Sequence, residues 1–323
     1  MTLIFGYLTW KFVEKPWRDT NVISKTQIFT YSLICTLILL VFGLLGYVNE
    51  GYPSRFTPEL LKLSNTRNHE ALLINSGCNL ENGKFNVETC VKGNKKIPPN
   101  FALIGDSHGQ AIAHELEESF KKNDISYIPF VSSGCPLNFY MEEAKIHDLQ
   151  KCALYQRAIK NELIARDDIR TLILISRRDD PSFDKRNPDE KVIKAFGSNI
   201  RSIKEILNLG KRVILIYPTP VHEIMVTNFM TKNTLFNNGR LESVSSDSIK
   251  FRKRIKYFYD GYDSIGLQSN LVRIKTDLIF CDSFEKLKCV YQVNGVPLYY
   301  DKGHLSNDGA RLIVNEIMKY IKN

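Results

Sequence analysis

The sequence predicts a three-layer α/β/α domain with a mostly parallel sheet, preceded by one transmembrane helix. From residue 100 onward, short apolar runs alternate with segments of helical spacing. This alternation is typical of βαβ units, whose helices cover both faces of the sheet. Upstream, Lys25 and Glu50 enclose 24 residues without a charge, which separates an apolar helix from the globular part of the chain.

The alternation predicts five strands and five helices. The strands are expected at Phe101–Ile104, Tyr127–Val131, Thr171–Ser176, Val213–Tyr217 and Leu271–Ile274. The helices are expected at Gln110–Lys122, His147–Ala165, Lys191–Leu209, Asp247–Tyr262 and Asn307–Ile321. Functional groups are expected at the carboxyl ends of the strands, where open parallel sheets bind ligands. Pro220–Ser246 fits this pattern poorly, and two interpretations stay open, an insertion over the site or a mobile lid.

The predicted membrane span is Ile28–Val48, which is almost wholly apolar. Its 21 positions would extend ~30 Å as a helix, enough to cross a bilayer. A secretory signal is shorter and lies nearer the N-terminus. Four basic residues precede the span, namely Lys11, Lys15, Arg18 and Lys25. The first basic residue after the span is Arg55. The large carboxyl-terminal part of the chain is therefore expected to face outward.

The net charge of +9 could favour anionic partners. The basic residues are scattered, however, and the one dense cluster is Arg252–Lys256. No zinc-finger, RNP-type or helix-turn-helix signature accompanies this cluster, which argues against nucleic-acid binding. A solvated helix face is the preferred interpretation of the cluster.

The cysteines predict an oxidising compartment. Cys35 lies in the apolar span, and six cysteines follow it, which allow 15 pairings. Pairing of nearest neighbours would join Cys78 to Cys90, Cys135 to Cys152, and Cys281 to Cys289. An even number in an outward-facing domain favours disulfides. The chain has no C-x-x-C or paired His–Cys spacing, which argues against a zinc site.

Ser107 is the candidate nucleophile. It lies in FALIGDSHG at Phe101–Gly109, where a buried strand is predicted to lead into a helix. At that junction its hydroxyl would lie at the carboxyl end of the sheet. Its N–H would lie at a helix N-terminus, where negative charge is stabilised. Asp106 is expected to cap the helix and brace the turn. Serine needs a base to become nucleophilic, and the motif itself supplies none except the adjoining His108.

The base is predicted in LYYDKGHL at Leu298–Leu305, just before the last helix. Asp301 and His304 are three positions apart, so in a loop the carboxylate can orient the imidazole toward a serine. The order Ser, Asp, His supports a triad in which His304 takes the proton from Ser107. His108 is the alternative base, but adjacent residues at a helix start point in different directions. It is expected at the cleft rim or packed beneath it.

These motifs resemble a known family. FALIGDSHG and YYDKGHLSNDGARLI, the latter at Tyr299–Ile313, are similar to the first and last conserved blocks of SGNH hydrolases. The similarity is to the branch fused to membrane acyltransferase-3 proteins, which O-acetylate bacterial surface polysaccharides. SSGCPLNF at Ser132–Phe139, LILISRRDD at Leu172–Asp180 and VILIYPTP at Val213–Pro220 agree with it. GYLTWKFVEKPWR at Gly6–Arg18 resembles the closing segment of an acyltransferase-3 domain.

The resemblance also implies an oxyanion hole. The N–H of Ser107 is one candidate donor, and Gly134 resembles the glycine of the second family block, whose amide is the usual second donor. A plain turn before Pro136 is an equal alternative for Gly134. The third donor is normally an asparagine, and Arg177 stands in its place. Its guanidinium could donate to the oxyanion, bind an acidic sugar, or form a surface ion pair.

As a function, the resemblance implies a membrane-anchored O-acetyltransferase in the bacterial inner membrane with a periplasmic catalytic domain. It would acetylate a sugar hydroxyl of a polysaccharide or lipid-linked glycan, such as lipopolysaccharide O-antigen, through an acetyl-serine. The acetyl group would come from cytoplasmic acetyl-CoA through an acyltransferase-3 membrane domain, with no metal or cofactor bound in this part. A carbohydrate acetylesterase and an inactive glycan-binding module are the alternatives.

The expected organisation has four parts and belongs to a larger acyltransferase. Residues 1–27 would close the acyltransferase-3 domain, 28–48 would span the membrane, 49–98 would form a linker with a disulfide-stapled loop, and 99–323 would form the SGNH domain.

Overall fold

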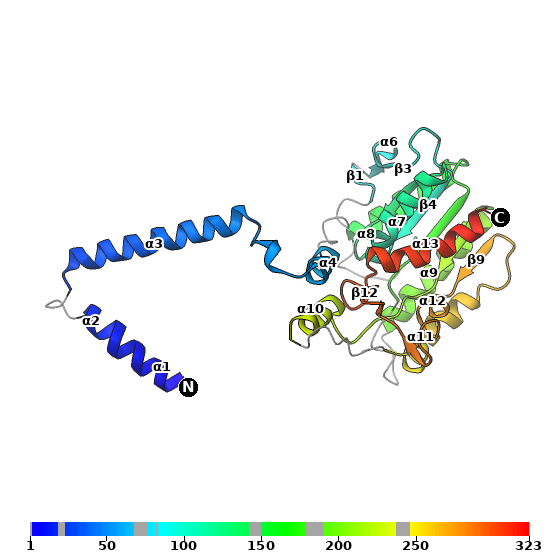
Figure 1. Ribbon diagram of the computed structural model, residues 1–323. Coiled ribbons are helices and arrows are strands. Elements are labelled where there is room, and N and C mark those ends of the chain that lie inside the picture. The colour runs from blue at the N-terminus through cyan, green and yellow to red at the C-terminus, as the bar shows by residue number, and fades with distance from the viewer. Residues whose placement is uncertain are drawn as a thin grey trace. The chain divides into compact units, whose positions relative to one another are not determined.

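The structure is a computed structural model that describes residues 2–18, 23–67, 77–81, 83–141, 150–178, 190–236 and 246–322. The chain divides into two compact units, Met1–Leu61 and Lys62–Asn323. Figure 1 shows their helices and strands.

The first unit is helical and carries the predicted span. Its elements are α1 (Thr2–Thr9), a π-helical turn (Trp10–Glu14), α2 (Lys15–Arg18), α3 (Lys25–Val48) and a 3₁₀ turn (Pro53–Arg55). Ser24 and Gln27 form a capping box that starts α3, so the helix begins slightly before Ile28. Its apolar window has a mean hydropathy of 2.5 and no buried residue. Among the described residues, α3 is the one helix long and apolar enough to cross a membrane.

The second unit contains a six-stranded sheet. Its spatial order is β3 (Lys92–Gly93), β5 (Ser126–Val131), β4 (Phe101–Gly105), β6 (Thr171–Ile175), β7 (Arg212–Ile216) and β9 (Leu271–Ile274). The edge strand β3 is antiparallel to β5, and all other pairs are parallel. The five predicted strands are confirmed to within one residue at each end. The strand order reverses direction between β4 and β6, which makes the carboxyl end of β4 the topological switch point.

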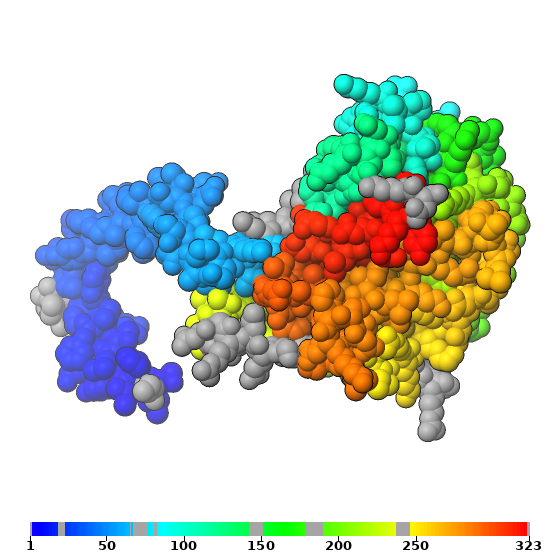
Figure 2. All heavy atoms as spheres, turned by 45° about the vertical axis from the view of Figure 1, so that its right-hand side comes forward, coloured from blue at the N-terminus to red at the C-terminus, as the bar shows by residue number. Residues whose placement is uncertain are grey.

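Helices cover both faces of this sheet, as predicted. One face carries α7 (Ser107–Lys122) and α13 (Asn307–Lys322), and the other carries α8 (Gln150–Ala165), α9 (Glu190–Asn208) and α11 (Ser248–Asp263). Strand β4 shows the alternation that builds the two layers. Leu103 packs with α7 and α13, whereas Ile104 packs with α8 and α9. In the space-filling view, α13 (red) lies beside α7 (blue-green) (Figure 2).

The predicted helices are confirmed, with small differences at their ends. Helix α7 begins at Ser107, not Gln110, because the side chain of Asp106 already caps it. The expected start of α8 at His147 lies outside the described residues. In Pro220–Ser246, the structure has α10 (Val226–Phe236), and residues 237–245 are not described.

Short elements complete the unit. They are β1 (Leu80–Glu81), β2 (Lys84–Phe85), α6 (Val87–Cys90), β8 (Ser246–Asp247), α12 (Asp277–Phe280), β10 (Lys288–Cys289), β11 (Gln292–Val293) and β12 (Val296–Pro297). Helix α4 (Pro58–Arg67) begins in the first unit and ends in the second. Cys78, Phe85 and Cys90 pack in the core beneath β4 and β5. The loop that they define is therefore part of the sheet domain's core.

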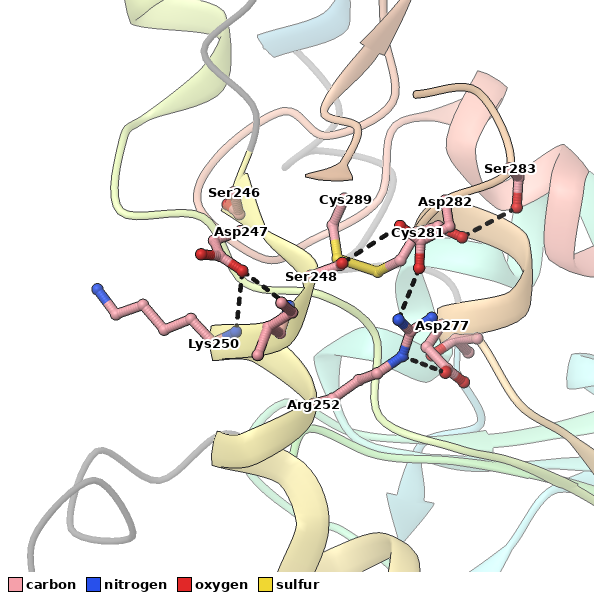
Figure 3. Close-up of a disulfide and its surroundings, with 12 residues drawn as sticks. Ser246, Asp247, Ser248, Lys250, Arg252, Asp277, Cys281, Asp282, Ser283 and Cys289 are labelled. Atoms are coloured by element: carbon pink, nitrogen blue, oxygen red, sulfur yellow. Dashed lines mark hydrogen bonds and ion pairs between the residues drawn. A yellow bond between two sulfur atoms is a disulfide. The ribbon is translucent and has the colours of Figure 1, made fainter. Parts of the chain in front are cut away.

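All three predicted disulfides are present. They join Cys78 to Cys90, Cys135 to Cys152, and Cys281 to Cys289, while Cys35 in α3 is free and exposed. Figure 3 shows the third disulfide beside the first turns of α11. There Arg252, whose side chain is 39% exposed, bonds to Asp277 and Asp282, with N–O distances of 3.0 and 2.6 Å. The predicted solvated face at Arg252–Lys256 is thus only partly correct, since Arg252 anchors the helix.

Candidate active site

The turn that carries the candidate nucleophile Ser107 is held in place by the buried side chain of Asp106. One carboxylate oxygen accepts a hydrogen bond from the N–H of His108 (2.9 Å), and the other accepts from the N–H of Arg177 (2.8 Å). The carboxylate therefore ties the end of β4 to the end of β6, as well as capping α7. A side chain at Gly105 would meet the carbonyl oxygen of Ile175 at 2.1 Å. Only glycine allows the two strands to approach closely just before Ser107.

Ser107, His304 and Asp301 form a continuous hydrogen-bonded chain. Nε2 of His304 lies 2.7 Å from Oγ of Ser107, 197 positions away in sequence. Nδ1 of His304 lies 2.6 Å from Oδ2 of Asp301. The second oxygen of Asp301 accepts from the N–H groups of Gly303 and His304, both at 2.7 Å. The structure thus brings together the three residues that the two motifs predict.

The charge of Asp301 determines which atoms donate and which accept in these hydrogen bonds. Burial acts to raise the pKa of Asp301, but the hydrogen bonds from the His304 ring and from the backbone N–H groups of Gly303 and His304 outweigh it. The pKa of Asp301 is consequently lowered, and the carboxylate is ionised at neutral pH. An ionised carboxylate only accepts hydrogen bonds, so the proton lies on Nδ1 of His304. Nε2 is then the acceptor that faces the hydroxyl of Ser107.

The segment after β7 holds in place the loop of residues 300–304, which carries Asp301 and His304 and which we call the catalytic loop. The N–H of His222 donates to the carbonyl of Lys302 (2.7 Å), and the hydroxyl of Thr227 donates to the carbonyl of Tyr300 (2.6 Å). The ring of Tyr300 stacks on His304 at 5.4 Å between centroids, with 16° between planes. Sequence reasoning missed these contacts. The available signal was topological, because this segment leaves the carboxyl end of a central strand.

His108 is not in the position of the base. Its side chain is 3% exposed, and its Nδ1 lies 3.3 Å from the hydroxyl of Thr219. Its ring packs against His304, with centroids 4.8 Å apart. The expectation that it packs beneath the cleft agrees with this placement, whereas the alternative of His108 as base does not.

Gly134 lies in a loop beside the nucleophile turn. The N–H of Ser132 donates to the carbonyl of Gly105 (3.1 Å), and the hydroxyl of Ser133 donates to Gln110 in the first turns of α7 (2.9 Å). Gly134 itself is exposed and has a φ of +70°, which favours glycine. The next residue, Cys135, is linked to α8 by its disulfide.

Arg177 follows β6 at the same edge of the sheet. Its backbone is fixed by Asp106, and its side chain is exposed. Its predicted alternative partners, Asp179 and Asp180, lie outside the described residues. The neighbouring Arg178 lies over the ring of Phe196 at 5.8 Å.

Within the described ranges, no three or more His, Cys, Asp or Glu side chains cluster in a way that could hold a metal ion. The chemistry available from the described side chains is that of a serine activated by an imidazole and a carboxylate.

Comparisons with known proteins identify the family and the fold. A family model described as "SGNH domain (fused to AT3 domains)" matches residues 77–319. No curated protein gives a significant sequence match. One similar solved structure is the periplasmic domain of a lipopolysaccharide acetyltransferase from Salmonella serovar Paratyphi A. It is 19% identical, with a TM-score of 0.57, and the match covers 81% of this chain and 97% of that one. An acylhydrolase candidate from Bacteroides fragilis is 13% identical, with a TM-score of 0.35, and the match covers 71% and 92%.

Proposed function

Because the chain belongs to the SGNH domains that are fused to acyltransferase-3 (AT3) domains, we propose that it transfers an acetyl group to a sugar hydroxyl of a bacterial surface polysaccharide. The family supports acyl transfer or hydrolysis. The observation that carries the proposal is the hydrogen-bonded chain from Ser107 through His304 to Asp301.

In the proposed first step, Oγ of Ser107 attacks the carbonyl carbon of the acetyl donor while Nε2 of His304 takes its proton. Asp301 stabilises the resulting imidazolium without accepting the proton. The N–H groups of Ser107 and Gly134 are the proposed donors to the oxyanion, where loss of one donor can cost ~3 kcal/mol. Collapse of the intermediate breaks the bond to the leaving group, which takes the proton from His304. An acetyl ester remains on Ser107.

The second step reverses these roles. A sugar hydroxyl gives its proton to His304 and attacks the acetyl carbon, and the bond to Oγ of Ser107 breaks. The proton passes from His304 to that oxygen, which regenerates the free serine and releases the acetylated sugar. Water in place of the sugar would give acetate, so a hydrolase uses the same three side chains.

We assign the domain to the periplasmic side of the inner membrane. The apolar helix α3 and the basic residues before it support an anchor with its amino end in the cytoplasm. The three disulfides support an oxidising compartment. An AT3 membrane domain would deliver the acetyl group from cytoplasmic acetyl-CoA, and the acceptor would be a polysaccharide or lipid-linked glycan.

The decisive experiment compares Ser107→Ala with Ser119→Ala, a matched change farther along α7. The full chain is incubated with an acetyl donor and candidate polysaccharides, and acetylated glycan and free acetate are both measured. Ser107→Ala is expected to reduce turnover by at least ~10³-fold, because no other group can form the acyl intermediate. Ser119→Ala is expected to keep it. Full turnover in Ser107→Ala would refute the proposed mechanism, and release of acetate alone by the wild type would identify a hydrolase.

A further inference from the structure

A pocket of about 240 Å³ lies beside the catalytic loop. We call it the His222 pocket. Its lining comes from the segment after β7, from β8 and from the first two turns of α11. The lining residues are Val221, His222, Glu223, Ile224, Ser246, Asp247, Lys250, Phe251, Arg254 and Ile255. Drug-sized ligands usually occupy pockets of ~300–1,000 Å³, so this one has room for a single small ring.

The wall of the pocket touches the catalytic loop directly. The N–H of His222 donates to the carbonyl of Lys302 at 2.7 Å. Val221 packs against Gly303, where an added Cβ would lie 3.3 Å from Cγ2 of Val221. Lys302 and Gly303 are the two residues between the proposed catalytic aspartate and histidine. A group in the pocket would therefore lie next to the loop that positions the base.

The charges of the pocket are balanced. Glu223 and Lys250 form an exposed ion pair at 2.5 Å. Asp247 caps α11 by accepting from two backbone N–H groups, and Arg254 supplies the second cation. With two carboxylates and two cations, the pocket has no strong preference for an anion or a cation. It offers charged hydrogen-bond donors and acceptors together, which bind hydroxyl groups well.

His222 adds a buried polar group to one side of the pocket. Its side chain is 3% exposed, and its Nδ1 lies 2.7 Å from the hydroxyl of Ser246. Nε2 has no hydrogen-bond partner among the described residues. Burial lowers the pKa of His222 to about 4, so the imidazole is neutral near pH 7. Val221 and Ile224, which are partly exposed, supply apolar surface of the kind that packs against the C–H groups of a sugar ring.

The pocket is built on a rigid edge. Strand β8 supplies Ser246 and Asp247 and pairs with β10. In this pairing, Ser246 of β8 faces Cys289 of β10. Cys289 is bonded to Cys281, and Figure 3 shows this disulfide beside Ser246 and the start of α11. Ser246 and its hydrogen-bond partner His222 are consequently held in place before any ligand arrives, which lowers the entropic cost of binding.

From these observations we infer that the His222 pocket binds one sugar ring of the acceptor glycan, adjacent to the ring that is acetylated. The inference rests on the proposed function, because it assumes a glycan acceptor at Ser107. It assigns the pocket to saccharide recognition and not to the chemical step.

The test measures sugar binding by saturation-transfer NMR on the full chain in detergent. The probes are methyl α-D-mannopyranoside, methyl α-D-galactopyranoside and methyl α-L-rhamnopyranoside. The pocket variant is Glu223→Gln/Lys250→Met, which removes an exposed ion pair of little value to stability. The matched control is Lys256→Met/Asp260→Asn, which removes an exposed ion pair two turns farther along α11. Hydrolysis of p-nitrophenyl acetate, which carries no sugar, reports whether each variant is folded and chemically competent.

We expect at least one glycoside to bind the wild type, the control pair and Ser107→Ala alike. The pocket variant should weaken that binding about tenfold while keeping the hydrolysis rate. The absence of binding by all three glycosides would overturn the inference, as would equal binding by the pocket variant. Displacement of the glycoside by inorganic phosphate would indicate an anion site instead. Failure of the proposed function has a separate sign, since it would appear as hydrolysis that survives Ser107→Ala.

Discussion

At the scale of single residues, the orientation of the His304 ring depends on Asp301. The carboxylate accepts three hydrogen bonds, from the imidazole and from two backbone N–H groups. Because its pKa is lowered in the folded state, it stabilises the fold at pH values above the ordinary aspartate pKa of ~4. This contribution is lost only as the pH falls through the lowered folded value. Loss of activity between neutral pH and pH 4 therefore cannot come from titration of Asp301.

Asp301→Asn is expected to reduce kcat/KM by a factor of ~10³–10⁴. The amide can donate to Nδ1 of His304, which favours the tautomer with its proton on Nε2, pointing at Ser107. Steady-state hydrolysis of p-nitrophenyl acetate measures the loss. A change of less than threefold would exclude Asp301 from the site.

His222→Asn is expected to remove part of the acid sensitivity of the fold. The pKa of His222 is about 4 in the folded chain, compared with ~6.5 in an unfolded chain. As the pH falls from about 6.5 toward 4, the unfolded chain takes up a proton that the folded chain does not, so the wild type loses stability. Between pH 7 and 4.5 this loss is about 2–3 kcal/mol. Urea unfolding at both pH values should show that His222→Asn escapes it, whereas exposed His114→Asn does not.

At the scale of elements, the disulfide between Cys135 and Cys152 joins the Gly134 loop to α8. A second link reinforces it, because the side-chain amide of Gln156 in α8 donates to the carbonyl of Cys135 (3.2 Å). The other side of this loop bonds to α7 through Ser133. The disulfide thus fixes the position of a proposed oxyanion donor and is more than a staple of the fold.

Replacing Cys135 and Cys152 by serine is expected to lower both stability and kcat. Opening a 17-residue loop costs ~3 kcal/mol, which corresponds to a fall in Tm of ~6–12 °C. Loosening of the Gly134 amide should reduce kcat about tenfold, the effect of ~1.4 kcal/mol in the transition state. Calorimetry and steady-state kinetics give the two values.

The matched control is Cys78→Ser/Cys90→Ser, which opens a 12-residue loop that bonds to β5 through the N–H of Cys78. It should lower Tm by a similar amount and keep kcat. If both double variants lose kcat equally, or if neither does, the Gly134 loop has no special role in catalysis.

Much of this architecture could be predicted from local pattern. The central strands are buried on both faces and therefore read as continuous apolar runs, such as Thr171–Ile175. The helices that cover them show regular spacing over three or more turns. Strand β3 escaped prediction because its two residues, Lys92 and Gly93, carry no pattern. Helix α12 has only four residues and likewise gives no periodic signal.

The candidate site divides in the same way. Ser107 could be predicted because its motif lies at the carboxyl end of β4, and His304 because its Asp-x-x-His motif lies just before the last helix. The bond between His222 and Ser246 joins residues 24 positions apart across a segment with weak periodicity, so no local pattern indicates it. The side chain of Arg177 is exposed, so a sequence motif could not predict where its guanidinium lies.

At the scale of the whole molecule, the proposed topology requires the two ends of α3 to lie on opposite sides of the membrane. Its 24 residues extend ~36 Å as a helix, which exceeds the ~30 Å hydrocarbon core. Lys11, Lys15 and Arg18 lie before it, and all three disulfides lie after it.

Labelling with a membrane-impermeant maleimide tests this topology in cells with a permeabilised outer membrane. Leu267→Cys, at a site 97% exposed, is expected to react in a Cys35→Ser background. Lys15→Cys is expected to react only after the inner membrane is opened. Labelling of Lys15→Cys in intact inner membranes, or protection of Leu267→Cys, would contradict both the orientation and the compartment.

The long separation between Ser107 and His304, 197 positions, also determines when reactivity can arise during biosynthesis. In a chain made from its amino end, Ser107 emerges early, at the junction of β4 and α7. His304 emerges only after β9, the last strand of the central sheet. Until then the hydroxyl has no proton acceptor and is a weak nucleophile. If the domain acts as proposed, its reactivity begins only when the loop that carries His304 reaches the carboxyl end of β4.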